Sequence, residues 1–366
     1  MLAFILPSLF VGLPLLGWWL ELPWLGLAAG ALVVPAGEWL IGGRTLGPGL
    51  RSVWLMRLLM AAVIVQIPLL ALLSSGSPWI TTMPRQALEG WDLLALALSV
   101  GYVSGGIGIV LAHELGHRRG GIDIALSRLL LVLVLWGPYR TEHNRGHHRR
   151  AATPDDPASA RAEESLFRFM LRYFPGVYRC GFALHARAGE HPMNALRSEG
   201  EQGRVSAGTS PRTSAGTRPW TSEAAILTAA SILAILLLAW LGGRQAAIFL
   251  LIQSAVALYL VCAVDYVEHW GLQRARKGNG WERIGARHTW DCANGLSDVL
   301  LFHLPRHAHH HMEPSLPAHA LERTSASPQM PTGYAGMVVL ASIPPLWFAV
   351  MRPRLAACRG SVLQAP

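Results

Sequence analysis

The sequence predicts an all-α membrane protein that crosses the bilayer six times, and three observations lead to this prediction. Apolar residues make up 52% of the 366 residues and charged residues only 14%, whereas soluble domains carry about 25% charged residues. Several apolar stretches have the length of about 20 residues that a helix needs to cross the hydrocarbon core. Basic residues gather in alternate connecting segments, a pattern typical of multi-pass membrane proteins.

Six apolar stretches are long enough to span, and they pair into three hairpins. They are residues 2–20, 23–42, 53–74, 91–112, 224–241 and 245–264. The run 125–137 is too short to span. Residues 335–351 are apolar but interrupted by Pro344 and Pro345, so we expect them to lie on the membrane surface.

The distribution of basic residues predicts the orientation. Segment 113–222 contains sixteen arginines, whereas loop 75–90 contains only Arg85. Because cytoplasmic segments carry the excess of basic residues, we expect both chain ends and the histidine-rich segments in the cytoplasm of a bacterial inner-membrane protein. The predicted parts are 1–112 (four transmembrane helices), 113–222 (cytoplasmic, with a flexible Ser/Thr/Gly/Pro-rich linker at 200–222), 223–264 (third hairpin) and 265–366 (cytoplasmic).

The net charge and the cysteine spacing exclude some classes of binding partner and of metal site. The net charge of +9 lies beside the predicted spans, which favours membrane lipid over nucleic acid. The four cysteines, which form no Cys-x-x-Cys pair, are Cys180, Cys262, Cys292 and Cys358. This spacing indicates neither a disulfide framework nor a metal centre held by thiolates.

Histidine is the residue type that points to function. All fifteen histidines lie after residue 112. Most fall into four clusters at predicted helix ends: HELGH (113–117), EHNRGHH (142–148), DYVEHWG (265–271) and RHAHHH (306–311). Imidazole is a common ligand of iron, copper and zinc. Packed imidazoles inside a membrane protein repel one another when protonated, so the clusters indicate metal binding.

The spacing within the clusters predicts which histidines bind. His113 and His117 are four residues apart and share one face of a helix. His143 and His147 repeat this spacing, and the adjacent His148 is expected to point toward a second ion. The last cluster gives a three-residue version of the arrangement. The nine predicted ligands of two ions are His113, His117, His143, His147, His148, His269, His307, His310 and His311. The isolated histidines are expected to be hydrogen-bonded residues that do not bind metal. They are His185, His191, His288, His303 and His319.

One cluster also fits another class of enzyme. HELGH matches the zinc-protease pattern H-E-x-x-H, in which Glu114 would be the general base. An intramembrane zinc protease needs three protein ligands and leaves the other clustered histidines unexplained. Imidazole ligation alone does not separate iron, copper and zinc. No catalytic residue beyond the metal ligands and no site for an organic cofactor is predicted, so electrons must come from outside.

The motifs resemble the membrane alkane 1-monooxygenases, which belong to the membrane di-iron group that includes fatty acid desaturases and xylene monooxygenase. The matching stretches are HELGHRR (113–119), EHNRGHHRR (142–150), ATPDDPASA (152–160), DYVEHWGL (265–272), RHTW (287–290) and LPRHAHHHM (304–312). The resemblance implies two iron ions held by the nine histidines. It also implies the reaction, which is hydroxylation of a terminal methyl group of a medium-chain alkane by dioxygen. The implied electron donor is a rubredoxin-type carrier with an NAD(P)H-dependent reductase.

Three positions depart from the family pattern and leave the substrate open. Asp265 stands where Asn is usual, Trp270 where Tyr is usual, and His309 where Asp is usual. His309 is either an extra neighbour of the metals or a replacement ligand. The alternatives are therefore an aromatic-methyl (xylene-type) monooxygenase and a fatty acid desaturase. The three residues between His143 and His147 are typical of the hydroxylases.

A basic surface is expected near the second cluster. Its residues are Arg118, Arg119, Arg149 and Arg150. They would either bind an acidic one-electron carrier or anchor the protein at the membrane surface.

Overall fold

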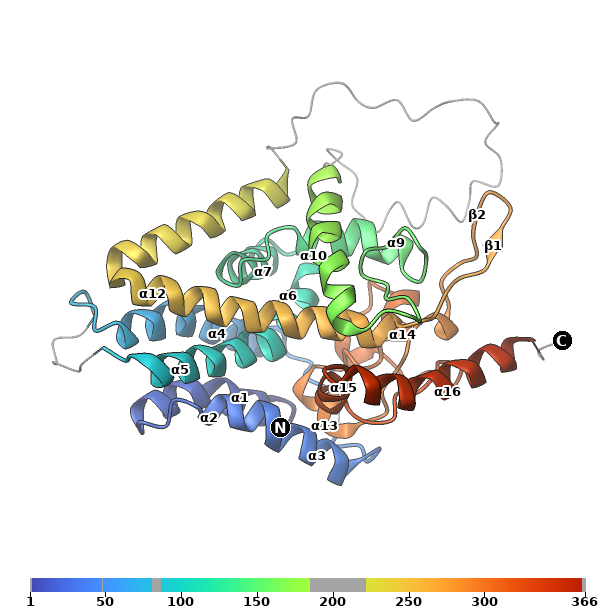
Figure 1. Ribbon diagram of the computed structural model, residues 1–366, viewed down its shortest axis with the longest axis horizontal. Coiled ribbons are helices and arrows are strands. Elements are labelled where there is room, and N and C mark those ends of the chain that lie inside the picture. The colour runs from blue at the N-terminus through green and yellow to red at the C-terminus, as the bar shows by residue number, and fades with distance from the viewer. Residues whose placement is uncertain (1, 48, 81–86, 185–221, 364–366) are drawn as a thin grey trace, which may run out of the picture.

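The computed structural model describes residues 2–47, 49–80, 87–184 and 222–363, and this part of the chain is mostly helical (Figure 1). The first half contains α1 (Leu2–Trp19), α2 (Leu25–Ala28), α3 (Val34–Ile41), α4 (Val53–Ser74), α5 (Gly90–Val103), α6 (Ile109–Gly116) and α7 (Gly121–Leu133). The second half contains α8 (Tyr139–Glu142), α9 (His148–Arg150), α10 (Leu166–Ala183), α12 (Glu223–His269), α13 (Gly295–Leu300), α14 (His307–Met312), α15 (Tyr334–Ala341) and α16 (Pro344–Leu363).

Shorter elements connect these helices. Three π-helical turns are η1 (Ala29–Val33), η2 (Ser104–Gly108) and η3 (His143–His147). Two 3₁₀ turns are η5 (Ala286–His288) and η6 (Ala318–Ala320). The strands β1 (Arg276–Lys277) and β2 (Gly280–Trp281) form a small antiparallel hairpin that protrudes beside α9 (Figure 1).

The protein is a multi-pass membrane protein, but the predicted count of six spans is not confirmed. Four helices are long and apolar enough to cross a membrane, or five if a bent pair forms one span. Residues 23–42 do not form a long straight helix, because the apolar helix there covers only Leu25–Ile41 and contains η1. Residues 224–241 and 245–264 form the two arms of α12, which are two helices joined at a sharp kink at Gly243 (φ 68°), close to the predicted turn of the third hairpin (Figure 1).

That the segment 335–351 lies on the membrane surface stays a prediction. The segment forms α15 and the start of α16, which meet at an angle of 119°. Met337 and Trp347 are fully buried, and α15 packs against α3 and α12. The segment is thus a bent helix pair packed into the protein, because its apolar side chains find partners there. The predicted linker 200–222 lies outside the described residues except for Ser222.

Two glycines let the span that carries the first histidines pack closely against α12. A Cβ atom on Gly101 would meet Val256 Cβ at 2.5 Å, and one on Gly105 would meet Ala257 Cα at 2.8 Å. Small residues four apart allow such close approach between membrane helices, where dispersion rather than the hydrophobic effect drives packing. Gln253 of α12 adds a buried hydrogen bond from Ser104 Oγ, 2.9 Å long. This contact joins α12, which ends at His269, to η2, which leads directly into α6 and His113.

Candidate metal centre

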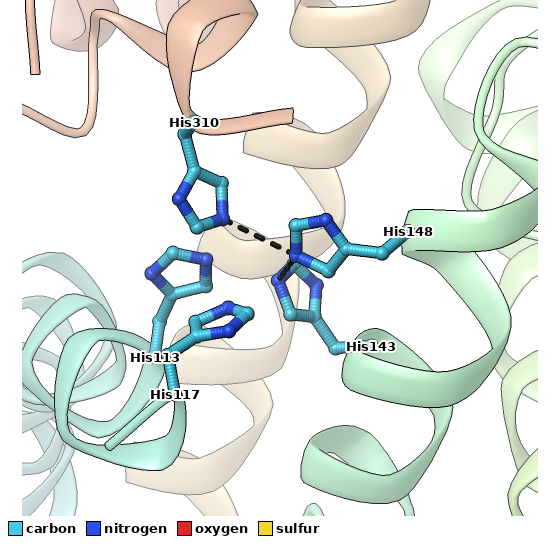
Figure 2. Close-up of side chains that lie close together, drawn as sticks. All are labelled: His113, His117, His143, His148 and His310. Carbon is cyan, nitrogen blue, oxygen red and sulfur yellow. Dashed lines mark hydrogen bonds between the residues drawn. The ribbon is translucent and has the colours of Figure 1, made fainter. Parts of the chain in front are cut away.

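The nine predicted ligands come together at one end of the long helices, from four separate parts of the chain. They form two groups in which one ligand atom from each residue lies within 4.8 Å of the others. Figure 2 shows the group of five, whose rings turn toward one another: His113, His117, His143, His148 and His310. The group of four is His147, His269, His307 and His311.

The π-helical turn η3 decides how the second cluster divides. His143 and His148 share the group of five, whereas His147 belongs to the group of four. The α-helical spacing predicted the opposite pairing, of His143 with His147. A π-helical turn bonds residue i to i+5, so residues five apart lie on one face. His143 and His148 therefore face one ion position together, and their Nε2 atoms are 3.0 Å apart.

The last cluster also divides between the groups. His307 and His311 are four apart on α14 and share the group of four, while His310 reaches the group of five. The predicted three-residue pairing of His307 with His310 is therefore not the one observed. Since adjacent residues of one helix point in different directions, both η3–α9 and α14 supply ligand candidates to each group. The two groups are consequently held beside each other by the same short helices.

The spacing of the nitrogen atoms fits shared metal ions. The Nε2 atoms of His307 and His311 are 3.0 Å apart, and those of His147 and His311 are 3.2 Å apart. Histidine nitrogen lies about 2.0–2.1 Å from an ion such as zinc, so two nitrogens at right angles around one ion are separated by roughly 3 Å. The observed separations match this value.

Several ring nitrogens need a partner that the described residues do not supply. The Nε2 atoms of His113, His117 and His269 are buried and have no hydrogen-bond partner there. A buried polar atom without a partner costs about 1–3 kcal/mol, and such atoms in native proteins call for a specific explanation. Metal ions in the two groups would supply the missing partner for all three atoms.

Burial keeps most of these imidazoles neutral, which is the form that binds metal. Burial, followed by the neighbouring imidazoles, lowers the pKa of His143, His148 and His310 well below its usual value. The same causes lower the pKa of His307 and His311. A neutral imidazole has a free lone pair on one ring nitrogen, so the site favours binding of a metal ion over protonation.

His147 is oriented by a carboxylate. Its Nδ1 lies 2.9 Å from Asp156 Oδ2, and Asp156 also accepts a hydrogen bond from Ser159 Oγ at 2.6 Å. Burial lowers the pKa of His147, but the charge of Asp156 and this hydrogen bond outweigh it and raise the pKa to about 9. With Nδ1 bonded to the carboxylate, Nε2 points into the group of four. Such carboxylate–histidine pairs fix ring orientation in metal sites.

A second carboxylate lies on the inner side of the group of four. Glu268 Oε2 is 3.1 Å from His307 Nε2, the nitrogen that faces His311. Tyr334 donates a hydrogen bond of 2.8 Å to Glu268 Oε1. Neither Asp156 nor Tyr334 is among the site residues that the sequence predicts, although Asp156 stands in the stretch 152–160 that resembles the family. Tyr334 has no local pattern that would reveal it.

The arrangement disfavours the protease alternative. Glu114 is held by an ion pair with Arg118 at 3.0 Å and by the backbone N–H of Ala318 at 3.2 Å. A general base must instead face the reacting water. His113 and His117 also stand in a group of five imidazoles, rather than in the three-ligand site of a catalytic zinc.

The other histidines stand apart from both groups within the described residues. His288 lies 3.0 Å from Glu282, and His303 packs against Gly49. His309 turns away and accepts a hydrogen bond from the backbone N–H of Glu322 at 2.8 Å, so it does not replace a ligand. His319 joins neither group, and His185 and His191 lie outside the described residues.

The residues of the predicted basic surface do not all face outward. Arg118 pairs with Glu114, and Arg150 pairs with Glu142 at 2.9 Å. Only Arg119 and Arg149 are exposed. Arg149 lies beside the β1–β2 hairpin, because its carbonyl accepts a hydrogen bond of 2.6 Å from Arg274. The exposed basic residues of this hairpin, Arg276 and Lys277, extend the surface away from the second cluster.

The part of the chain that holds both histidine groups is similar to known proteins. The family model for fatty acid desaturases matches residues 89–341. The chain is 34% identical to alkane 1-monooxygenase 2 of Pseudomonas aeruginosa over 95% of the chain and 89% of that relative. It is 37% identical to alkane 1-monooxygenase 1 of the same organism, over 73% of the chain and just 65% of that relative. Identity to the hydroxylase component of a Pseudomonas putida xylene/toluene monooxygenase is 24%, over 73% of the chain and 66% of that relative.

Asp156→Ala is expected to lower metal affinity at the group of four by about 10–100-fold, because His147 loses the carboxylate that orients it. Metal bound per chain, measured by elemental analysis after dialysis against a chelator series, checks this. Asp155→Ala is the matched control, since Asp155 is exposed and should leave the metal content unchanged. Equal metal retention in both variants would contradict the orienting role.

Proposed function

Because the chain belongs to the membrane alkane 1-monooxygenase family, we propose that it is a non-haem di-iron hydroxylase acting on a terminal methyl group of a medium-chain alkane or a similar lipophilic substrate. The observation that carries the proposal is the pair of adjacent imidazole groups, five and four in number. The proposed ligands are those nine histidines. The reaction consumes one dioxygen, two electrons and two protons, and yields an alcohol and one water.

The two irons, when bound, supply the activation of dioxygen, and the chain's own residues do the rest. The nine histidines hold the metals, and Asp156 orients His147. Methyl C–H bonds offer no acidic or basic group, so no side chain is assigned as a proton carrier to the substrate. The protein's remaining task is to bring a methyl group to the metals and to exclude water.

An apolar cavity beside the metal centre is the proposed substrate site. It contains about 750 Å³ of empty space, part of it open to the outside. Val110 and Leu304 line it and stand three residues before His113 and His307, one from each group. Leu260 and Ile107 add further apolar walls. The lining thus includes residues that stand close in sequence to a proposed ligand of each group.

The departures from the family pattern lie away from this cavity. Asp265 accepts a hydrogen bond of 2.5 Å from Tyr173, and Trp270 donates one of 3.3 Å to the carbonyl of Glu164. Neither residue, nor His309, lines the cavity among the described residues. The apolar lining therefore favours a hydrocarbon over a fatty acid, whose carboxylate would need a polar partner.

We place the metal centre on the cytoplasmic side of a bacterial inner membrane. Support comes from the excess of arginine in the histidine-bearing segments and from the bacterial relatives. On that side, a rubredoxin-type carrier supplied by an NAD(P)H-dependent reductase is the proposed electron donor. Its proposed docking surface comprises Arg149, Arg276, Lys277 and Arg283, which are exposed. The hairpin begins a few residues after His269, so a carrier bound there lies near the group of four.

The central test is metal and product analysis of the purified protein. We expect about two irons per chain and 1-octanol as the product from octane. p-Xylene and a fatty acid are supplied as the alternative substrates. Because desaturation removes two hydrogens without adding oxygen, a double bond in the fatty acid would support the desaturase alternative instead. A single zinc and no oxygen consumption would exclude both oxidative functions.

Gly106→Leu tests the cavity. Gly106 lines it, and a Cβ atom there would meet nothing within 4 Å. The added side chain would therefore occupy substrate space, and kcat/KM for the longest accepted alkane should fall about tenfold or more while the shortest is little affected. Gly12→Leu is the control, because a Cβ on Gly12 also meets nothing within 4 Å but Gly12 does not line the cavity. Equal chain-length profiles in both variants would place the substrate elsewhere.

Reversal of two charges tests the docking surface. In Arg276→Glu/Lys277→Glu, KM for the carrier should rise about tenfold at low ionic strength while kcat is unchanged, because electrostatic attraction acts on association. The control is Arg168→Glu, on the exposed face of α10. It should change neither KM for the carrier nor kcat. A wild-type rate that does not respond to salt would favour membrane anchoring over docking.

A further inference from the structure

A buried carboxylate in the part of the chain before the first histidine has no role in the proposed reaction so far. Glu38, in α3, is only 1% exposed. Its Oε1 accepts hydrogen bonds from Ser297 Oγ and from the backbone N–H of Ala335, and its Oε2 accepts one of 2.8 Å from Gly336 N–H. Glu38 therefore binds the first turn of α15 through two backbone N–H groups.

From Glu38, hydrogen bonds lead step by step to the group of four. Ser297 Oγ, which donates to Glu38, accepts a bond of 3.1 Å from Tyr334 N–H. Tyr334, 1% exposed, donates through its hydroxyl to Glu268 Oε1 at 2.8 Å. Glu268 Oε2 then lies 3.1 Å from His307 Nε2. Each member is buried, so water does not compete for these bonds.

We propose that Glu38 is a positioning residue for the metal centre, acting through Tyr334 to hold the Glu268 carboxylate against the four-histidine group. The proposal rests on the proposed function in one respect, that this group binds a metal ion. It assigns Glu38 to the four-histidine group only, because none of these hydrogen bonds reaches the group of five.

The position of Glu268 matters because of charge. Four neutral imidazoles around a divalent cation supply no negative charge in a site of low dielectric constant, which is costly, and Asp156 acts on that charge only through His147. A carboxylate beside the ligand nitrogens offsets part of that charge. If Tyr334 no longer holds Oε1, Glu268 is free to rotate, and the four-histidine group should bind metal more weakly.

The hydrogen-bond pattern requires a carboxylate at position 38. Three donors converge on its two oxygens. Glutamine offers a single acceptor oxygen, and its NH₂ group would face a donor. The helix itself stays anchored in such a variant, because Asn294 Nδ2 donates to the backbone carbonyl of Glu38 at 2.8 Å. The substitution therefore removes the carboxylate contacts and keeps the docking of α3.

Anaerobic titration of the metal-free full-length protein with Co²⁺ tests the proposal. Wild type should bind two ions. In Glu38→Gln and Tyr334→Phe one ion should bind as in wild type, and the other about 10–100-fold more weakly, the range for lost support of metal ligands. Glu38→Asp, which keeps both acceptor oxygens, should retain more affinity than Glu38→Gln. The double variant Glu38→Gln/Tyr334→Phe should be no weaker than the worse single variant, because both break one path.

Gln66→Leu is the matched control. Gln66 is also a buried tether of the first helices and donates a hydrogen bond of 2.8 Å to the carbonyl of Val11, but within the described part of the chain no hydrogen-bonded path leads from it to the histidines. This variant should lose thermal stability and keep both Co²⁺ affinities. Unchanged affinities in both Glu38→Gln and Tyr334→Phe would overturn the proposal, as would an equal loss in Gln66→Leu. A wild type that binds one ion would instead contradict the two-metal function.

Discussion

The structure depends on one constraint: nine imidazoles are packed so closely that the ligand nitrogens of each group lie within 4.8 Å of one another, and several pairs lie only about 3 Å apart. Without cations between them, these nitrogens have poor partners, and unsatisfied buried polar atoms cost about 1–3 kcal/mol each. Protonation offers no relief, since charges of one sign would then be packed together in a site of low dielectric constant. Metal ions held by the two groups would satisfy all nine at once, and the surrounding elements bring the nine rings together.

Helix geometry meets the constraint by departing from the regular α-helix. The π-helical turn η3 rotates His148 onto the face of His143 and frees His147 for the other group. The short helix α14 likewise sends neighbouring histidines to different groups. One pair of short helices thus contributes to both groups, which keeps the two proposed metals close enough for a common reaction.

Carboxylates connect this centre to the rest of the protein. Asp156 orients His147 from the loop that follows the second cluster. Glu268 faces the group of four and is held, through Tyr334 and Ser297, by Glu38 of the first helices. Glu38, Ser297 and Tyr334 also line the apolar cavity. The wall of the proposed substrate site and the support of one metal group are therefore made by the same residues.

The sequence by itself determined the helical membrane class, the family and the set of histidines that converge, because apolar length and clustered imidazoles are local patterns. It did not determine how those histidines divide into two groups. That division depends on a π-helical turn, which the spacing of the histidines in the sequence does not reveal. Tertiary structure also decided the bent pair α15–α16 and the path from Glu38 to His307. That path joins residues more than 250 positions apart, and only the packing of α3 against α13 and α15 brings them into hydrogen-bond range.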